Sequence, residues 1–461
     1  MTDFSALLIP DRDQPARLIT PVAAADFESW LATQPERARA AVEAARFSGK
    51  PDTLVILPGD QAGEWSVAIG MAEGNDPWRL AYAASNLPEG SYRLAQGSPG
   101  DGALGWLLAQ HRFDRYRQKP EAAGPRILLT DEPARIDALV RLAEATALVR
   151  DMVDTGASDM GPADLQAAAG ALAGRYGATL TVTEGAALAD GFPMIHAVGR
   201  AASVARAPRL IELEWGDPAH PCVAIVGKGV CFDSGGLDIK PSAGMLLMKK
   251  DMGGAAHALA LAQLVMANRL PVRLHLLIPA VENAISADAF RPGDVLRSRK
   301  GLSVEIGNTD AEGRLILADA LTRACEADPT LMIDFATLTG AARVALGPDL
   351  PALFANDDAL AADLLEAGTT MGDPLWRLPL WAPYLDMLKS DVADINNAGG
   401  AFAGSVTAAL FLQKFVPEGV AWAHLDTFAW RPSAKPGRPK GGEALGLRAV
   451  YLLLARRFGA S

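Results

Sequence analysis

Short apolar runs and segments of helical periodicity alternate over the first 130 residues. The runs TLVIL (53–57) and RILLT (126–130) are rich in branched side chains and predict strands. The Ala-rich segment PERARAAVEAAR (35–46) predicts a helix. We therefore expect residues 1–130 to form a small α/β domain.

A polar turn at 130–135 precedes a long helical pattern. Apolar residues recur at helical spacing from Leu139 to Met152, and the pattern continues to about Val153. We predict a linking helix over 131–155, at the junction between the small domain and the remainder of the chain.

The remainder, residues 156–461, shows the same alternation. Its apolar runs predict strands at 179–182, 222–227, 272–281 and 331–338, and its helical patterns lie near 253–268, 315–326 and 404–415. Strands that alternate with helices are typical of a mixed or mostly parallel sheet with helices on its faces. The predicted fold class is α/β, with a small N-terminal α/β domain and a larger C-terminal domain built on a central mixed sheet flanked by helices.

The composition indicates a folded protein, because 50% of the 461 residues are hydrophobic and 21% are charged. A formal net charge of -11 gives no general attraction to nucleic acid or to an anionic membrane. The most apolar stretch, 254–281, is interrupted by polar residues and is too polar to span a bilayer. The basic, partly aromatic segment 111–119 could contact nucleic acid, but a solvated helix end is the commoner case. We expect no membrane partner, and nucleic acid is disfavoured.

The cysteines bear on the cellular compartment. Cys222, Cys231 and Cys325 are few, odd in number and irregularly spaced, which fits a reducing compartment better than a disulfide framework. The N-terminal segment carries Asp3 and Asp11 where a targeting sequence favours cations. A cytoplasmic location is expected.

The densest chemical signal is the segment 226–256, which runs from the carboxyl end of an apolar strand to the start of a helix. It contains Lys228, Asp233, Lys240 and Asp251. Ligands gather at this end of the strands in α/β sheets, and the intervening Gly, Ser and Pro residues allow tight turns. Each residue alone also has a structural interpretation, as a surface lysine or a helix cap. No phosphate-loop pattern is present.

A second signal is NTDAEGRLILADAL (308–321), in which Asp310 and Glu312 come just before a helical run. Two such carboxylates alone are usually acids in the first turn of a helix. With Asp233 and Asp251 they make four carboxylates, enough to neutralise two divalent cations, and hard oxygen ligands suit Mg, Mn or Zn. Without cations, gathering them would cost several kcal/mol. The combination predicts a two-metal site.

Both segments resemble those of the leucine aminopeptidase (cytosol aminopeptidase) family of two-metal exopeptidases. NTDAEGRL (308–315) is similar to the family's signature octapeptide, and GKGVCFDSGG, IKPSAGM and KKDMGGAA match its other catalytic segment in order and spacing. The resemblance covers about residues 135–461, and it implies that 156–461 is the catalytic domain of a dinuclear-metal aminopeptidase. Residues 1–130 resemble a shorter version of the family's N-terminal domain.

The resemblance implies a role for each matching residue. The metal ligands would be Lys228, Asp233, Asp251, Asp310 and Glu312, with Asp233 and Glu312 serving both ions. Lys228 would bind as a neutral amine, which requires its pKa to fall below the usual value. The ions would be Mn or Zn, with Mg or Co as alternatives. They would bind and acidify a bridging water, and one of them would hold the free amino group of the substrate.

The resemblance also implies two catalytic residues outside the metal shell and a set of substrate contacts. Arg314 would hold a bicarbonate ion that acts as general base, and Lys240 would stabilise the developing oxyanion. The substrate would meet Met248, Thr337, Leu338, Gly340 and Ala429. Of these, Leu338 would act through its backbone carbonyl, and the other four would form a small apolar pocket suited to Leu or Met.

The implied assembly is a homohexamer whose active sites face an interior cavity, which would restrict substrates to short peptides. Two other interpretations stay open. Another two-metal hydrolase, such as a phosphoesterase, could have a similar carboxylate cluster. A DNA-binding role, known for some members of the family, would be a minor addition at most in so acidic a chain.

Overall fold

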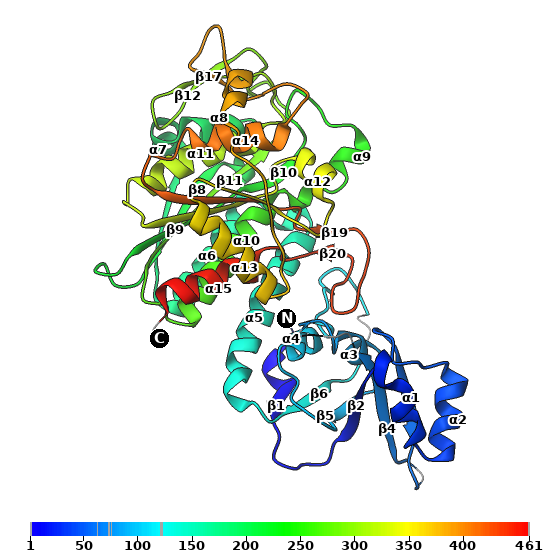
Figure 1. Ribbon diagram of the computed structural model, residues 1–461. Helices are drawn as coiled ribbons and strands as arrows, with labels where there is room; N and C mark the ends of the chain where they lie inside the picture. Colours follow the sequence, from blue (N-terminus) through cyan, green and yellow to red (C-terminus); the bar gives the residue numbers. More distant parts are fainter. Residues whose placement is uncertain (1, 62, 72–73, 75, 120–122, 460–461) are drawn as a thin grey trace. The chain divides into compact units, whose positions relative to one another are not determined.

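The computed structural model describes residues 2–61, 63–71, 74, 76–119 and 123–459, which form two compact units (Figure 1). The first unit contains the described residues up to Ala147 and the segment Ser433–Lys440. The second contains Leu148–Pro432 and the described residues from Gly441 onward. The predicted linking helix is α5 (Ile136–Asp154), in which the division between the units falls. The division of roles between the two parts of the chain stays a prediction.

The first unit is built around a six-stranded sheet in the order β1-β6-β5-β2-β4-β3. All neighbours pair in parallel except β3, which is antiparallel to β4. The strands are β1 (Leu8–Pro10), β2 (Arg17–Ala23), β3 (Leu54–Pro58), β4 (Trp65–Met71), β5 (Gly90–Leu94) and β6 (Arg126–Thr130), and the helices are α1 (Phe27–Ala32), α2 (Glu36–Ala45), α3 (Ala81–Asn86) and α4 (Gly102–Leu108). The predicted strands at 53–57 and 126–130 and the predicted helix at 35–46 are confirmed as β3, β6 and α2.

The prediction of a helix end at 111–119 is wrong, because α4 already ends at Leu108 and no helix lies in that segment. The buried side chain of Gln110 explains the early end. Its amide nitrogen donates to the backbone oxygen of Arg126, and its amide oxygen accepts from the backbone nitrogen of Arg126, both at 2.9 Å. These bonds hold the chain against β6 in an irregular conformation.

The second unit is built around a nine-stranded mixed sheet in the order β16-β15-β18-β14-β9-β11-β8-β7, with β10 beside β11. The central strands β18, β14, β9 and β11 pair in parallel. Strands β8 and β7 pair antiparallel to their neighbours, and β15 is antiparallel to β18 but parallel to β16. The strands are β7 (Thr179–Glu184), β8 (Arg209–Trp215), β9 (Cys222–Gly227), β10 (Gly229–Asp233), β11 (Arg273–Asn283), β14 (Leu331–Ala336), β15 (Ala352–Ala355), β16 (Trp376–Arg377) and β18 (Ala421–Asp426). Two smaller sheets contain β12 (Val295–Arg297), β13 (Ser303–Glu305) and β17 (Ile395–Asn396), and β19 (Trp430–Arg431) and β20 (Gly441–Gly442).

Helices cover both faces of this sheet, which confirms the predicted fold class (Figure 1). On one face lie α7 (Gly185–Gly191), α8 (Pro193–Gly199), α11 (Glu312–Cys325) and α14 (Gly404–Gln413), and on the other lie α6 (Pro162–Tyr176), α10 (Gly253–Ala267), α13 (Asp358–Thr370) and α15 (Leu447–Phe458). Helix α10 is apolar on every side because it is buried between the sheet and the helices α6 and α15. Among the described helices, none has the length and apolar character needed to cross a membrane.

The elements predicted at 179–182, 222–227, 272–281 and 331–338 are confirmed as β7, β9, β11 and β14, and those near 253–268, 315–326 and 404–415 as α10, α11 and α14. Strands β8 and β18 were not among the predictions. The sequence AWAHLD of β18 has weak strand character on its own. It forms a strand because β14 and β15 pair with its two edges.

Candidate active site

Four strands of the second unit end at a cavity of about 620 Å³. Lys228 directly follows β9, Thr337 directly follows β14, and Asp233 and Asp426 are the last residues of β10 and β18. The parallel pairing of β9, β14 and β18 puts their carboxyl ends at one edge of the sheet. All four residues line the cavity, as ligand sites at the carboxyl ends of parallel strands commonly do.

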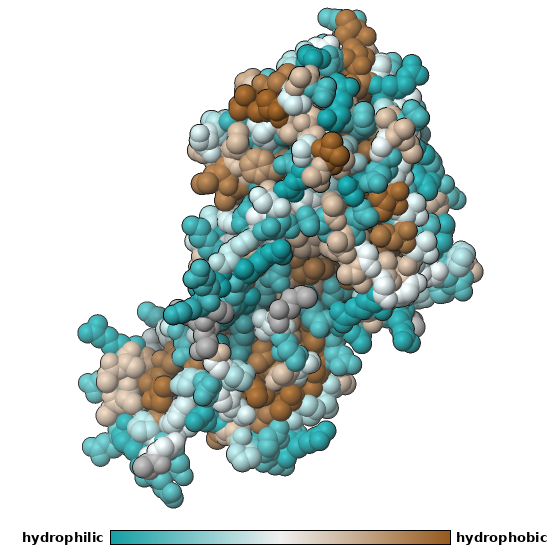
Figure 2. Space-filling model, turned by 180° about the vertical axis from the view of Figure 1, so that it is seen from behind, coloured by the Kyte–Doolittle hydropathy of each residue, from teal (hydrophilic) through white to brown (hydrophobic). Residues whose placement is uncertain are grey.

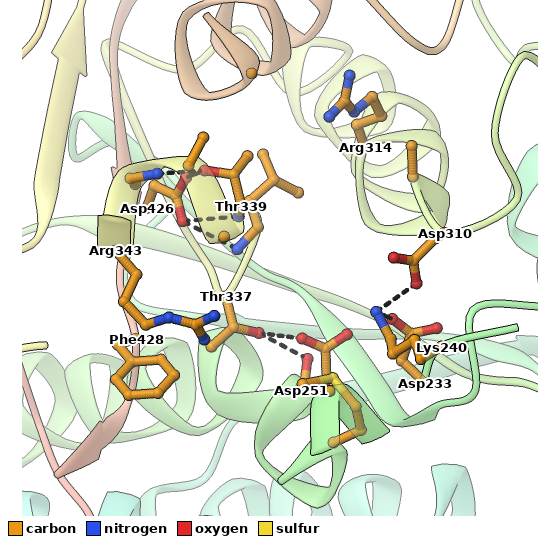
Figure 3. A pocket seen from close by; sticks show the side chains of 18 of the residues that line it. Asp233, Lys240, Asp251, Asp310, Arg314, Thr337, Thr339, Arg343, Asp426 and Phe428 are labelled. Atoms are coloured by element: carbon orange, nitrogen blue, oxygen red, sulfur yellow. Dashed lines mark hydrogen bonds and ion pairs between the residues drawn. The ribbon is translucent and has the colours of Figure 1, made fainter. Parts of the chain in front are cut away.

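The loop after β10 folds back on itself. Gly235 and Gly236 have φ values of +89° and +64°, a region of backbone conformation that glycine adopts without strain. The turn brings the Nζ atom of Lys240 to 2.8 Å from Oδ2 of Asp233. The same amine forms an ion pair with Asp310 from the second sequence motif (Figure 3). The two motifs therefore meet at Lys240.

Lys228 joins the other two carboxylates. Its side chain is buried, and its Nζ atom lies 2.7 Å from Oδ2 of Asp251 and 2.9 Å from Oε1 of Glu312. Gly313, in the first turn of α11, leaves the space for this amine, since a Cβ atom there would lie 2.7 Å from Nζ. Burial acts to lower the pKa of Lys228, but attraction to Asp251 and Glu312 outweighs it and raises the pKa.

The carboxylates repel one another. Oxygen atoms of Asp233, Asp310 and Glu312 lie within 4.8 Å of each other, a spacing at which one metal ion could be held. Burial, followed by the charge of Asp233, raises the pKa of Glu312 to about 8 and that of Asp310 to about 6. Within the described part of the chain, Oε2 of Glu312 is buried without a hydrogen-bond partner. A cation bound here would satisfy this oxygen and offset the repulsion, so the residues fit a metal site.

Arg314 lines the cavity two residues after Glu312. Its Nη1 atom donates to the backbone oxygen of Asn397 at 2.7 Å. Its Nε atom is buried and has no hydrogen-bond partner among the described residues. Burial lowers the pKa of Arg314 to about 10, although Glu312 and Asp426 favour its charge. A buried guanidinium with a free donor is suited to binding an anion.

The predicted substrate contacts fall in two places. Met248, Thr337, Leu338 and Gly340 line the cavity. Ala429 is fully buried and is not among the residues that line the cavity in the described chain. Its Cβ atom faces Gly253, behind the wall that Thr337 contributes. The roles of these residues stay predictions.

Known proteins are similar to this chain in sequence and in architecture. The profile of the cytosol aminopeptidase family catalytic domain matches residues 147–451, and that of the M17 aminopeptidase N-terminal domain matches residues 18–128. The probable cytosol aminopeptidase of Syntrophotalea carbinolica is 44% identical over 367 residues, which are 76% of this chain and 73% of that protein. The chain belongs to the cytosol aminopeptidase family.

Solved structures agree with this assignment. The crystal structure of the cytosol aminopeptidase from Coxiella burnetii is 46% identical, with a TM-score of 0.93 over 98% of this chain and 99% of that one. The bottromycin maturation enzyme BotP, solved in complex with Mn, is 33% identical, with a TM-score of 0.85 over 98% of this chain and 99% of that one. The chain is therefore an aminopeptidase, a hydrolase, as the sequence motifs predicted.

Several residues that were not predicted from the sequence hold the motifs of this aminopeptidase in place. Nδ2 of the buried Asn283 donates to Oδ1 of Asp233 at 2.8 Å and to the backbone oxygen of Thr309 at 3.2 Å. Asp238 accepts from the backbone nitrogen of Thr309 at 2.7 Å. Asn283 ends a strand that carries no motif, so nothing in the sequence marked it. Asp238 and Thr309 lie inside the motifs but have no predicted chemistry.

Proposed function

We propose that this aminopeptidase depends on two divalent ions and releases N-terminal Leu, Met or other apolar residues from short peptides. The observation that carries the proposal is the gathering of four buried or half-buried carboxylates around two lysines at the carboxyl ends of the strands. The complex of BotP with Mn supports a metal requirement. Mn or Zn are the expected ions, with Mg or Co as alternatives.

The residues that would hold the ions are Lys228, Asp233, Asp251, Asp310 and Glu312. Their oxygen-rich donor set suits hard divalent cations. When bound, two such ions supply Lewis-acid activation of a water molecule and of the scissile carbonyl group. Two nearby cations would also oppose the raised pKa of Lys228 and favour its neutral amine.

Two side chains act outside the ligand set. Arg314, whose buried Nε donor has no partner among the described residues, would hold a bicarbonate ion, which would supply the general base. In the metal-free protein, Asp233 and Asp310 raise the pKa of Lys240 against the effect of burial. The ammonium group of Lys240 would stabilise negative charge on the substrate carbonyl oxygen. The backbone carbonyl of Leu338 would accept a hydrogen bond from the substrate.

The side chain of the departing residue lies against Met248, Thr337 and Gly340, with Ala429 behind them. These walls are apolar or small and match Leu or Met.

The assembly that we propose is a homohexamer. Apolar side chains lie among polar ones over the surface of the second unit (Figure 2). Val344, Trp381 and Phe402 are 85%, 55% and 80% exposed, which is unusual for large apolar residues and suits burial between subunits. We also expect a cytoplasmic location, as for the relatives named cytosol aminopeptidases, and short peptides rather than nucleic acid as partners.

The test compares Leu-Gly-Gly with its N-acetylated form, before and after metal removal and after re-addition of Mn or Zn. We expect hydrolysis of the free peptide only, and only with metal. Equal hydrolysis of both peptides would contradict the exopeptidase assignment. Full activity after exhaustive chelation, with metal loss verified by elemental analysis, would contradict the metal requirement.

A further inference from the structure

Two cationic side chains lie beside one aromatic ring in the cavity. The Nζ atom of Lys250 is 5.5 Å from the centroid of the Phe428 ring, and the Cζ atom of Arg343 is 4.8 Å from the same centroid. All three residues line the cavity, together with Met248 and Thr337, which we assign to the substrate side chain. The pocket for that side chain thus has a charged part as well as apolar walls.

Lys250 is unusually buried for a lysine, because only 4% of its surface is exposed. Its closest carboxylate oxygen is Oδ1 of Asp251, at 3.5 Å, which is longer than a good charge-assisted hydrogen bond. Among the described residues, this contact with Asp251 is the only ion pair of Lys250. Asp251 itself is held more closely by Lys228, at 2.7 Å, and by the hydroxyl of Thr337, at 2.8 Å. The Nζ atom of Lys250 is therefore left with one long contact to a carboxylate that two other groups already hold.

Arg343 adds a second positive charge. It projects from α12 (Gly340–Leu346), and Figure 3 shows it beside Phe428 on the side of the cavity where Thr337 and Asp251 lie. In the described parts of the chain, Arg343 has no carboxylate partner. Its positive charge disfavours a second positive charge on Lys250 and so lowers the pKa of Lys250. An anion bound between the two cations would relieve their repulsion and gain a desolvated ion pair.

We propose that Lys250, with Arg343, binds the side-chain carboxylate of an acidic N-terminal residue, so that the enzyme releases Glu as well as apolar residues. The inference rests on the proposed function and extends its substrate class. Met248 and the Phe428 ring would pack against the methylene groups that Glu shares with Met, which explains how one pocket takes both. The carboxylate would then face the ammonium group of Lys250.

The experiment measures kcat/KM for the aminoacyl-coumarinylamides of Glu, Gln and Met, which have similar size but different charge. We expect the wild-type enzyme to cleave the Glu substrate faster than the Gln substrate. Lys250→Met should lower the ratio of Glu to Met cleavage by about 10–100-fold, the effect of losing a buried charge-assisted contact. Arg343→Gln should lower it less, by about 2–5-fold, since Arg343 is exposed.

Two variants serve as controls. Lys249→Met removes the neighbouring lysine, whose amine donates to the backbone oxygen of Asp154 and does not line the cavity among the described residues. It should leave the Glu to Met ratio unchanged. Lys250→Arg keeps the charge and should retain most of the preference. Competitive inhibition by free glutamate, compared with norleucine, gives a second measurement that does not depend on turnover.

The outcomes separate the two proposals. If the wild-type enzyme cleaves the Met substrate but not the Glu substrate, or if Lys250→Met leaves both the ratio and glutamate inhibition unchanged, this inference is wrong and the aminopeptidase proposal stands. If the metal-loaded enzyme cleaves none of the substrates, including the Leu derivative, the proposed function fails, and this inference with it.

Discussion

The Nζ atom of Lys228 lies 2.9 Å from Oε1 of Glu312, in the space that Gly313 leaves open. Lys228 thereby bridges Glu312 and Asp251, while Lys240 bridges the other two carboxylates. The two lysines differ in exposure, with side chains 3% and 15% exposed. We therefore expect Lys228 to affect metal binding and Lys240 to affect the rate of the reaction.

Lys228→Ala should weaken metal binding and make it less dependent on pH. The carboxylates around Lys228 raise its pKa, so a metal that binds the amine must displace a proton. Calorimetric titration with Mn at several pH values, in buffers of different ionisation enthalpy, measures both affinity and proton release. Unchanged affinity and proton release would exclude Lys228 from the coordination shell.

Lys240→Ala should keep both metals and lower kcat by about 10²–10³-fold, because stabilisation of charge on the substrate oxygen is lost. Elemental analysis and steady-state kinetics on the same preparation test this. A variant that loses metal in proportion to activity would show that Lys240 mainly holds Asp233 and Asp310 in place.

Glu312→Ala should abolish activity and reduce metal content, whereas Arg314→Ala should retain metal and lose about 10²–10⁴-fold in rate, the range for a general base. Added bicarbonate should stimulate the wild-type enzyme more than the Arg314 variant. The proposed role of Arg314 would be refuted by a variant with normal rate and normal bicarbonate response.

Gly313→Ala should impair metal binding although it changes no ligand. The new Cβ atom would come within 2.7 Å of Nζ of Lys228, in a fully packed region, and would force the amine away from Glu312. A matched control is Gly174→Ala in α6, where a Cβ atom meets nothing within 4 Å. That variant should keep metal binding and gain up to about 1 kcal/mol in unfolding free energy. Equal metal affinity in both variants would contradict the packing argument.

The metal-free protein should become less stable as the pH rises from about 4.5 to about 8. The pKa of Glu312 is higher in the folded protein, at about 8, than the ordinary 4.5, so the folded state holds this proton more tightly. The stabilisation is complete below the ordinary value and is lost as the pH rises through the folded value. Urea unfolding after chelation measures the trend.

Glu312→Gln, which has no titrating group at this position, should show a smaller loss of stability over the same range. Exposed Glu418→Gln is the control and should behave as the wild-type protein. Parallel pH profiles for wild type and Glu312→Gln would show that the pKa of Glu312 is not raised in the folded protein.

The proposed ligand set could be predicted from the sequence because its members stand in two short segments. Asp310, Glu312 and Arg314 are within five positions of each other, and local chain geometry keeps them at the start of one helix. Apolar runs and helical patterns likewise predicted the central elements β9, β11, β14, α10 and α11, since elements buried in the core need apolar side chains wherever they face it.

Other features of the site depend on contacts between segments that are distant in the chain. Local sequence patterns do not predict these contacts. Which lysine meets which carboxylate follows from how the start of α11 packs against the segments that follow β9 and β10. Asn283 contacts Asp233 because β10 pairs with β11. Lys250 contacts Phe428 because η6 (Met248–Met252) and the residues after β18 line the same cavity. Motif spacing specifies the chemistry within a loop, whereas sheet order and packing decide which loops share a site.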